Sequence, residues 1–140
     1  MSLANLKFKP GTYLAFVLSD ESRSKLLGLK PPQFGRVLCH HVTIQFAVTE
    51  KQLETFQAQY SKADPEVEVF GYSKFEHLEC FSIRLGGATV RPGGGFFHIT
   101  HSLKAPAKPV DSNHLLKTIH GIPQEKLKPI RLTGNYELVK

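Results

Sequence analysis

The chain has 140 residues, a length that fits one domain, and its 41% hydrophobic content excludes an unfolded segment. The net charge of +6 suits anionic partners such as nucleotides, RNA or acidic lipid surfaces. Like charges never form a block of five or more, so an RNA-binding tail is not indicated.

Targeting and redox signals are sparse. No stretch approaches the roughly 18 apolar residues of a membrane span, and Met1–Pro10 has no apolar segment of a secretory signal. We therefore expect a cytoplasmic protein, no membrane association, one domain over residues 1–140, and buried reduced thiols at Cys39 and Cys80.

The first half of the chain alternates strand and helix signals. Gly11–Leu18 is rich in β-branched and aromatic residues and predicts a strand. Ser19 is an N-cap candidate for a helix over Glu21–Leu29, which a Pro-Pro pair then stops. The run Arg36–Ala47 contains the second strong strand.

Thr49 and Gln52 have the spacing of a capping box and predict that another helix begins there. Val67–Tyr72 and His77–Leu85 predict two strands of a hairpin that turns around residues 73–76. Glycines at both ends of Gly86–Gly95 indicate a loop.

Phe96–Leu103 predicts the next strand, and a short helix follows that Asp111 or Ser112 caps and Gly121 ends. Ile130–Val139 predicts the final strand. Short connections between adjacent strands favour an α+β fold with mostly antiparallel sheet over a doubly wound parallel sheet.

A His-x-Thr motif occurs once in each half of the chain, on predicted strands: His41-Val42-Thr43 and His98-Ile99-Thr100. Side chains alternate between the two faces of a strand, so each His and its Thr share a face while the intervening apolar residue points into a core. Each motif therefore presents an imidazole and a hydroxyl from rigid backbone.

This pairing suits phosphodiester chemistry. One neutral imidazole can take a proton from the attacking hydroxyl or water, and the other, as imidazolium, can protonate the departing oxygen. The hydroxyls can donate hydrogen bonds to the non-bridging phosphate oxygens. The chemistry requires neither a metal nor another cofactor, and the motifs leave open which histidine is the base.

Paired His-hydrophobic-Thr-hydrophobic tetrads in a small α+β domain resemble the 2H phosphoesterase superfamily, which includes 2′-5′ RNA ligase-like proteins, cyclic phosphodiesterase domains of tRNA ligases and phage enzymes that destroy cyclic oligonucleotide signals. The resemblance covers about Gly11 to Val139 and is strongest to the last two groups. It implies a two-lobed, pseudo-symmetric fold of mostly antiparallel sheets flanked by helices around a central cleft.

By the same resemblance, His41 and His98 are the catalytic pair, and Thr43 and Thr100 bind phosphate. His101 departs from the pattern, because it occupies the fourth position of the second tetrad, where the family usually has an apolar residue. Alternation places it on the face opposite His98, so the departure concerns packing of the far face.

Other residues are candidates with structural alternatives. Arg91, inside the glycine-rich loop, is a better candidate for phosphate or base contact than Arg84, and Tyr13 is the preferred candidate for base stacking. The weaker candidates are Tyr72 and Phe75 for stacking and Lys7, Lys9 and Lys104 for attraction of an anion.

His40 should face away from His41 by alternation, which makes it a core or surface histidine. The same rule opposes a zinc site built from His40, His41, His98 and His101, because it sends two of the four to the wrong face.

The sequence therefore predicts a metal-independent phosphodiesterase. Its substrate is an RNA end with a 2′,3′-cyclic phosphate or a cyclic oligonucleotide signal, the latter as in phage immune evasion, and specificity lies in the loops Lys30–Arg36 and Gly86–Gly95. Two alternatives stay open: a nucleotide or RNA binding module without turnover, and a structural domain with two buried strand histidines. Oligomeric state is not readable from the sequence.

Overall fold

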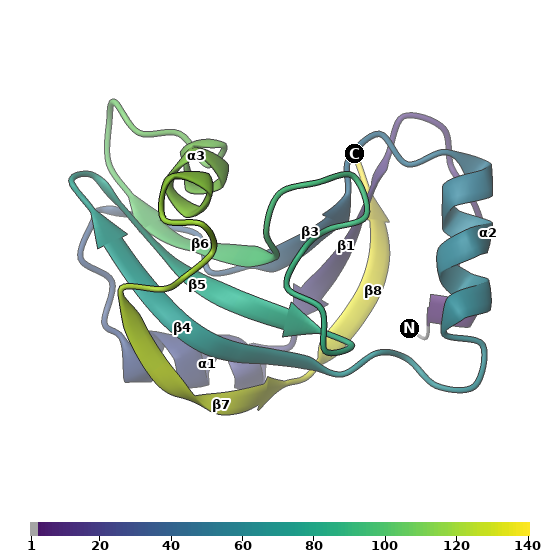
Figure 1. Cartoon of the computed structure of the whole chain (residues 1–140), viewed down its shortest axis with the longest axis horizontal. Helices are drawn as coiled ribbons and strands as arrows, with labels where there is room; N and C mark the ends of the chain where they lie inside the picture. The colour runs from purple at the N-terminus through teal and green to yellow at the C-terminus, as the bar shows by residue number, and fades with distance from the viewer. Residues whose placement is uncertain (1–2) are drawn as a thin grey trace.

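The computed structural model describes residues 3–140. Met1 and Ser2, which the sequence analysis included in the domain and in the search for a secretory signal, lie outside the described residues. The fold is α+β and two-lobed, with two antiparallel sheets of three and five strands (Figure 1). The three-stranded sheet has the order β3-β1-β8, and the five-stranded sheet has the order β2-β6-β5-β4-β7.

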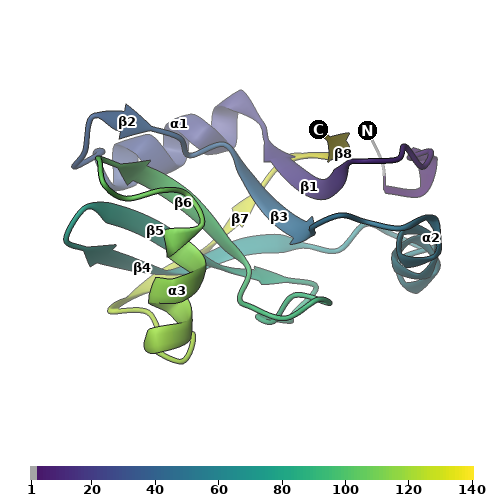
Figure 2. The same ribbon diagram turned by 90° about the horizontal axis from the view of Figure 1, so that it is seen from above.

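The three-stranded sheet forms one lobe. Its central strand β1 (Tyr13–Leu18) pairs on one side with β3 (His41–Gln45) and on the other with β8 (Gly134–Val139). Helix α2 (Glu50–Gln59) and the short 3-10 helix Leu3–Asn5 lie beside this sheet (Figures 1 and 2).

The five-stranded sheet forms the other lobe. The long hairpin of β4 (Val67–Phe75) and β5 (Leu78–Leu85) is its centre, with β6 (His98–Leu103), β2 (Arg36–Val37) and β7 (Glu125–Leu132) outside it. The hairpin turns later than predicted, since β4 continues to Phe75.

Helices cover both faces of this larger sheet. Leu26 of α1 (Asp20–Leu29) joins the main core with Phe81 and Ile83, whereas Leu115 and Leu116 of α3 (Asp111–Thr118) pack on Leu78 and Cys80, from the opposite side (Figure 2). No helix within residues 3–140 is both long enough and apolar enough to cross a membrane.

Local signals fix the starts of α1 and α2. The Ser19 hydroxyl accepts a hydrogen bond from Ser22 N at 3.1 Å, and Thr49 and Gln52 form the complete capping box, as predicted. The prediction for α3 was wrong: its N-cap is Val110, and the Asp111 carboxylate instead accepts from the backbone N–H of Lys108 at 2.8 Å.

Two predicted single strands are each divided between the two sheets. Arg36–Ala47 becomes β2 and β3, because Cys39 takes a left-handed φ of 46° and turns the chain from one sheet to the other. Ile130–Val139 becomes the end of β7 and β8, divided at Thr133, whose backbone N–H donates to the Ser22 hydroxyl at 2.8 Å.

Both cysteines are buried and unpaired, as expected. Burial raises the pKa of Cys39 to about 11 and that of Cys80 to about 12, so both remain neutral thiols at physiological pH.

Candidate active site

The two His-x-Thr motifs lie on β3 and β6, one in each lobe, and their side chains alternate as predicted. Val42 and Ile99 are fully buried in the main core. The four flanking side chains, His41, Thr43, His98 and Thr100, line one pocket. The fold thus brings together the residues that the sequence spacing had selected.

The pocket has a volume of about 510 Å³ and lies where the two sheets meet. Besides the motif residues, its walls are formed by aromatic, basic and small polar side chains and by the segment before α3. These further lining residues are Tyr13, Arg36, Leu38, His40, Phe46, Arg91, Pro109, Val110 and Asn113. None of the lining residues is acidic, so the field in the pocket favours an anionic ligand.

His98 is held by its own strand. Its Nδ1 lies 2.8 Å from the carbonyl oxygen of Phe96; since a carbonyl only accepts, Nδ1 carries the proton and Nε2 is the nitrogen left for a substrate. Burial lowers the pKa of His98 to about 4, and Arg91 and His41 add to the effect, while the Phe96 hydrogen bond opposes it.

His41 lies beside two rings. Its Nδ1 is 3.1 Å from Nδ1 of His40, and its ring centroid is 5.7 Å from that of Tyr13. Burial, followed by the influence of His40, lowers the pKa of His41. Both imidazoles are therefore neutral in the free protein at pH 7.

The prediction that His40 faces away from His41 was wrong. Alternation holds only inside a regular strand, and β3 begins at His41. His40 follows the left-handed Cys39, and this turn brings its exposed ring back to His41 and to the pocket wall.

The two threonine hydroxyls differ in their partners. Thr100 Oγ1 lies 2.8 Å from the hydroxyl of Ser112, a fully buried residue of α3. Thr43 Oγ1 has no hydrogen-bond partner among residues 3–140 and is free to donate to a ligand. Ser112 was predicted only as a helix cap; its contact with Thr100 depends on how α3 packs, which the sequence does not show.

The glycine-rich loop holds Arg91 at the pocket wall. Its Nη2 donates to Asn113 Oδ1 at 3.1 Å and its Nε to the Gly94 carbonyl at 3.2 Å, while the buried Nη1 has no partner among residues 3–140. Gly95 has φ of +82°, and a Cβ there would lie 2.8 Å from Arg91 Nη2. The loop therefore needs glycine at this position to let the guanidinium pack against it.

Phe46 is a pocket residue that the sequence argument missed. Its side chain is 55% exposed, its ring centroid is 5.8 Å from that of Tyr13, and the Arg91 guanidinium lies 5.4 Å from its ring. It follows β3 directly, and an apolar residue in a strand-like run gives no signal of exposure. An exposed ring with these neighbours offers a flat surface to a nucleobase.

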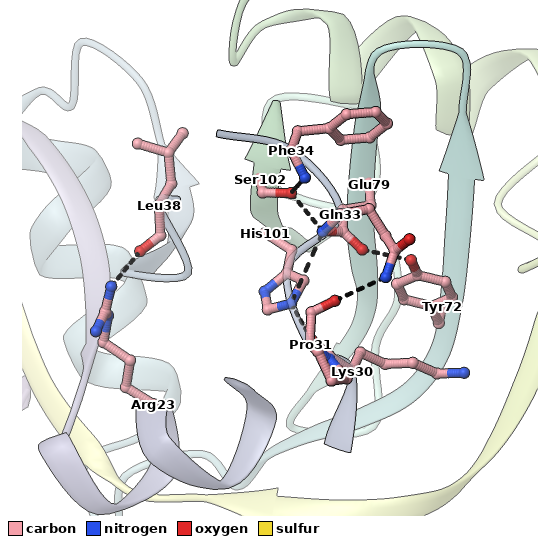
Figure 3. A network of polar contacts seen from close by, with 10 residues as sticks. All are labelled: Arg23, Lys30, Pro31, Gln33, Phe34, Leu38, Tyr72, Glu79, His101 and Ser102. Carbon is pink, nitrogen blue, oxygen red and sulfur yellow. Dashed lines mark hydrogen bonds and ion pairs between the residues drawn. The ribbon is translucent and has the colours of Figure 1, made fainter. Parts of the chain in front are cut away.

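Arg36 is the second basic residue of the pocket wall and stands at the end of the predicted specificity loop Lys30–Arg36, although it was not singled out by itself. Its side chain is exposed and has no hydrogen bond or ion pair with the other residues of the 3–140 range. The loop that leads to it is held by a buried polar cluster consisting of Tyr72, Glu79, His101 and Ser102 (Figure 3).

This cluster binds the loop backbone at three points. Glu79 Oε2 accepts from the N–H of Gln33 at 2.8 Å, Ser102 Oγ accepts from the N–H of Phe34 at 3.2 Å, and His101 Nε2 donates to the carbonyl of Lys30 at 2.6 Å. Tyr72 and Ser102 donate their hydroxyl protons to Glu79. Side chains on the far face of β6 thus position the loop, and His101 contributes through its hydrogen bond to the carbonyl of Lys30.

The weaker candidates lie elsewhere. Tyr72 is buried in the polar cluster, and Phe75 lines a different pocket between the β4–β5 turn and α3. Arg84 pairs with Glu68 at 3.4 Å and stacks on Phe70, while Lys7 and Lys9 line a groove along β8. Lys104 lies over Phe34, outside the pocket wall.

Metal ligands do not gather in the described part of the chain, where no group of three or more His, Cys, Asp or Glu side chains is placed to hold an ion. Of the four histidines considered for zinc, His101 lies on the far face of β6, 4.0 Å from Glu79.

Comparison with known proteins supports the fold alone. No protein-family model and no curated protein matches the sequence. Among solved structures, the chain is similar to one described as a fungal RNA kinase, with a TM-score of 0.56 and 16% sequence identity. The alignment covers 97% of this chain and 45% of the other, so the chain spans less than half the length of that protein.

Proposed function

We propose that the chain is a phosphodiesterase that uses His41 and His98 as its acid–base pair, without a metal, on a nucleotide phosphodiester. One observation carries the proposal: two imidazoles and two threonine hydroxyls, from strands of different sheets, line one pocket together with two arginines and no acid. A binding site for an anion alone does not require two paired neutral imidazoles.

The proposed reaction is hydrolysis. One imidazole takes a proton from water through its Nε2 as the water oxygen attacks phosphorus, and the other donates a proton to the departing ribose oxygen. Thr43 and Thr100 donate hydrogen bonds to the non-bridging oxygens. For a 2′,3′-cyclic phosphate, one P–O bond forms and one breaks, which leaves a phosphomonoester and a free hydroxyl.

The neutral state of both imidazoles has a consequence for this scheme. The acid must acquire its proton, and the negative charge of the bound phosphodiester raises the pKa of the imidazole beside it. Substrate binding therefore prepares the acid, and the low pKa values in the free protein keep both residues neutral until then.

Among substrates, we favour an RNA end with a 2′,3′-cyclic phosphate over cyclic oligonucleotides. The similar solved structure is described as an RNA kinase, and we carry its RNA over to this chain as part of the proposal. Phe46 and Tyr13 offer base-stacking surfaces next to His41, which supports recognition of the nucleoside attached to the phosphate.

The test is turnover in the presence of EDTA. The protein is incubated with a short RNA ending in a 2′,3′-cyclic phosphate and, in parallel, with cyclic di- and trinucleotides. Turnover that survives the chelator and is lost in both His41→Ala and His98→Ala supports the proposal. His114→Ala is the matched control, because His114 is exposed on α3 outside this pocket and its loss should leave the rate unchanged.

Two results would contradict the proposal. Activity that disappears with EDTA would indicate metal-dependent chemistry. Tight RNA binding without turnover of any substrate would favour the binding module.

A further inference from the structure

Each motif histidine has its Nδ1 occupied by a neighbour in the chain, but the two neighbours differ in kind. The neighbour of His98 is the carbonyl oxygen of Phe96, at 2.8 Å, which is always an acceptor. The neighbour of His41 is Nδ1 of His40, at 3.1 Å, which accepts when that nitrogen is unprotonated and donates when it is protonated. The second contact can therefore reverse its polarity.

We infer that His40 is a positioning residue for His41: its unprotonated Nδ1 accepts from Nδ1–H of His41 and so leaves Nε2 of His41 for the substrate. This inference rests on the proposed function. It holds whether His41 is the base or the acid, since Nε2 exchanges the proton in either role.

The backbone around His40 is held by hydrogen bonds on both sides, which keeps the His40 ring next to His41. Its carbonyl accepts from the N–H of Leu18 in β1 at 2.9 Å, and the N–H of the preceding Cys39 donates to the carbonyl of Thr100 in β6 at 2.9 Å. The left-handed φ of 46° at Cys39 directs the His40 ring toward His41. The turn that joins the two sheets thus also supplies the orienting group.

Few other groups compete for this role. The titratable or charged residues that share the pocket wall with His41 are Tyr13, Arg36, His40, Arg91 and His98, and no carboxylate is among them. Tyr13 approaches His41 with its ring, at 5.7 Å between centroids. His40 is the one with a ring nitrogen at hydrogen-bond distance from His41.

The polarity of the contact decides the tautomer of His41. If the Nδ1 of His40 carried a hydrogen, it would be the donor, and His41 could keep the contact only by accepting through its own Nδ1. The proton of neutral His41 would then lie on Nε2, which is the wrong tautomer for a base.

Three substitutions separate this role from simple packing. In His40→Asn, the side-chain amide lies near the position of Nδ1 and keeps an acceptor there. His40→Gln extends the amide toward the former position of Nε2 and serves as the matched control of similar polarity. His40→Ala removes the group entirely.

Tautomers are read from side-chain ¹⁵N shifts of labelled protein at pH 7.5, independently of activity. His41 should carry its proton on Nδ1 in the wild type and in His40→Asn, and should lose this preference in His40→Gln and His40→Ala. With cyclic-phosphate RNA, kcat should fall about 10–100-fold in the latter two, with KM within about twofold, the range known for groups that orient metal-bound histidines.

Failure of this inference differs from failure of the proposed function. An Nε2–H tautomer of His41 in the wild-type protein, or an unchanged kcat in His40→Ala, would overturn the role of His40. The predicted tautomers in a protein that turns over no phosphodiester would support the contact and overturn the proposed function.

Discussion

At the scale of single residues, the hydroxyl of Thr43 is the one whose removal should lower the rate most directly. Thr43 has no partner among residues 3–140, whereas Thr100 shares a hydrogen bond with Ser112. We expect Thr43→Val, which keeps the shape of the side chain, to lower kcat about 100-fold, as for loss of one donor to a developing oxyanion.

The matched control is Thr43→Ser, which keeps the donor and should stay within about tenfold of the wild-type rate. Both variants are checked by steady-state kinetics and by circular dichroism. Equal loss of rate in Thr43→Val and Thr43→Ser would show that the methyl group, and not the hydroxyl, is what matters at this position.

The pH profile is a second prediction at this scale. The acid must be protonated and the base unprotonated, and the pKa values of both His41 and His98 lie below 6.5 in the free protein. The maximum of kcat/KM, which reports free-enzyme pKa values, should therefore lie below pH 6.5. The maximum of kcat should lie higher, because the bound anion raises the pKa of the imidazoles.

These profiles are measured between about pH 4.5 and 9 on protein shown to remain folded. A value of kcat/KM that stays level up to pH 8 would mean that the proton donor is not an imidazole with a lowered pKa.

At the scale of elements, most strands and helices were predictable because each has a local cause. Runs with apolar and aromatic residues predicted β1, β5 and β6, and the capping box predicted the start of α2. The divisions at Cys39 and Thr133 were not predictable, because each run stays strand-like on both sides and the switch of sheet depends on long-range pairing.

The candidate site was predictable to a similar extent. The period of two in a strand selected His41, Thr43, His98 and Thr100 for one pocket, but it failed at His40, which precedes the strand. Phe46 reaches the pocket, and Ser112 reaches Thr100, through the packing of a loop and of α3, and no local pattern in the sequence marks that packing. Arg36 was included only as the end of the loop predicted to carry specificity.

The polar cluster under the loop before β2 gives a prediction about this element. Glu79 accepts three hydrogen bonds, from Gln33, Tyr72 and Ser102, and Glu79→Gln replaces one of its acceptor oxygens by a donor. We expect a loss of about 1–3 kcal/mol in the free energy of unfolding. Faster amide exchange at Gln33 and Phe34 and a higher KM should follow, because the loop positions Arg36.

Thr49→Ala is the control for this prediction. It removes the N-cap of α2, which should cost about 1 kcal/mol, and Thr49 does not line the candidate pocket. Its KM should be unchanged. An equal change of KM in both variants would attribute the effect of Glu79→Gln to general destabilisation.

At the scale of the whole molecule, the histidines make stability depend on pH. The folded state lowers the pKa of His41, His98 and His101, so the unfolded chain binds protons first as pH falls. The free energy of unfolding should be highest above about pH 6.5 and should decrease as the pH falls from there toward 4.

Urea denaturation across this range checks the prediction. His101→Gln keeps a side-chain N–H donor for the carbonyl of Lys30 but does not titrate, so its stability should decrease less steeply than that of the wild type. A parallel decrease in both proteins would assign the acid sensitivity to other groups.

The order of strands in the smaller sheet bears on how the protein is made. Strand β1 is synthesised long before its partner β8, because residues 19–133 lie between them, and a shorter stretch, residues 76–124, separates β4 from its partner β7. The hairpins β4–β5 and β5–β6 can pair during translation, which would fix His98 early. The lobe that carries His41 is complete only once residues 134–139 have emerged, so a nascent chain should have no finished pocket until β8 has been synthesised.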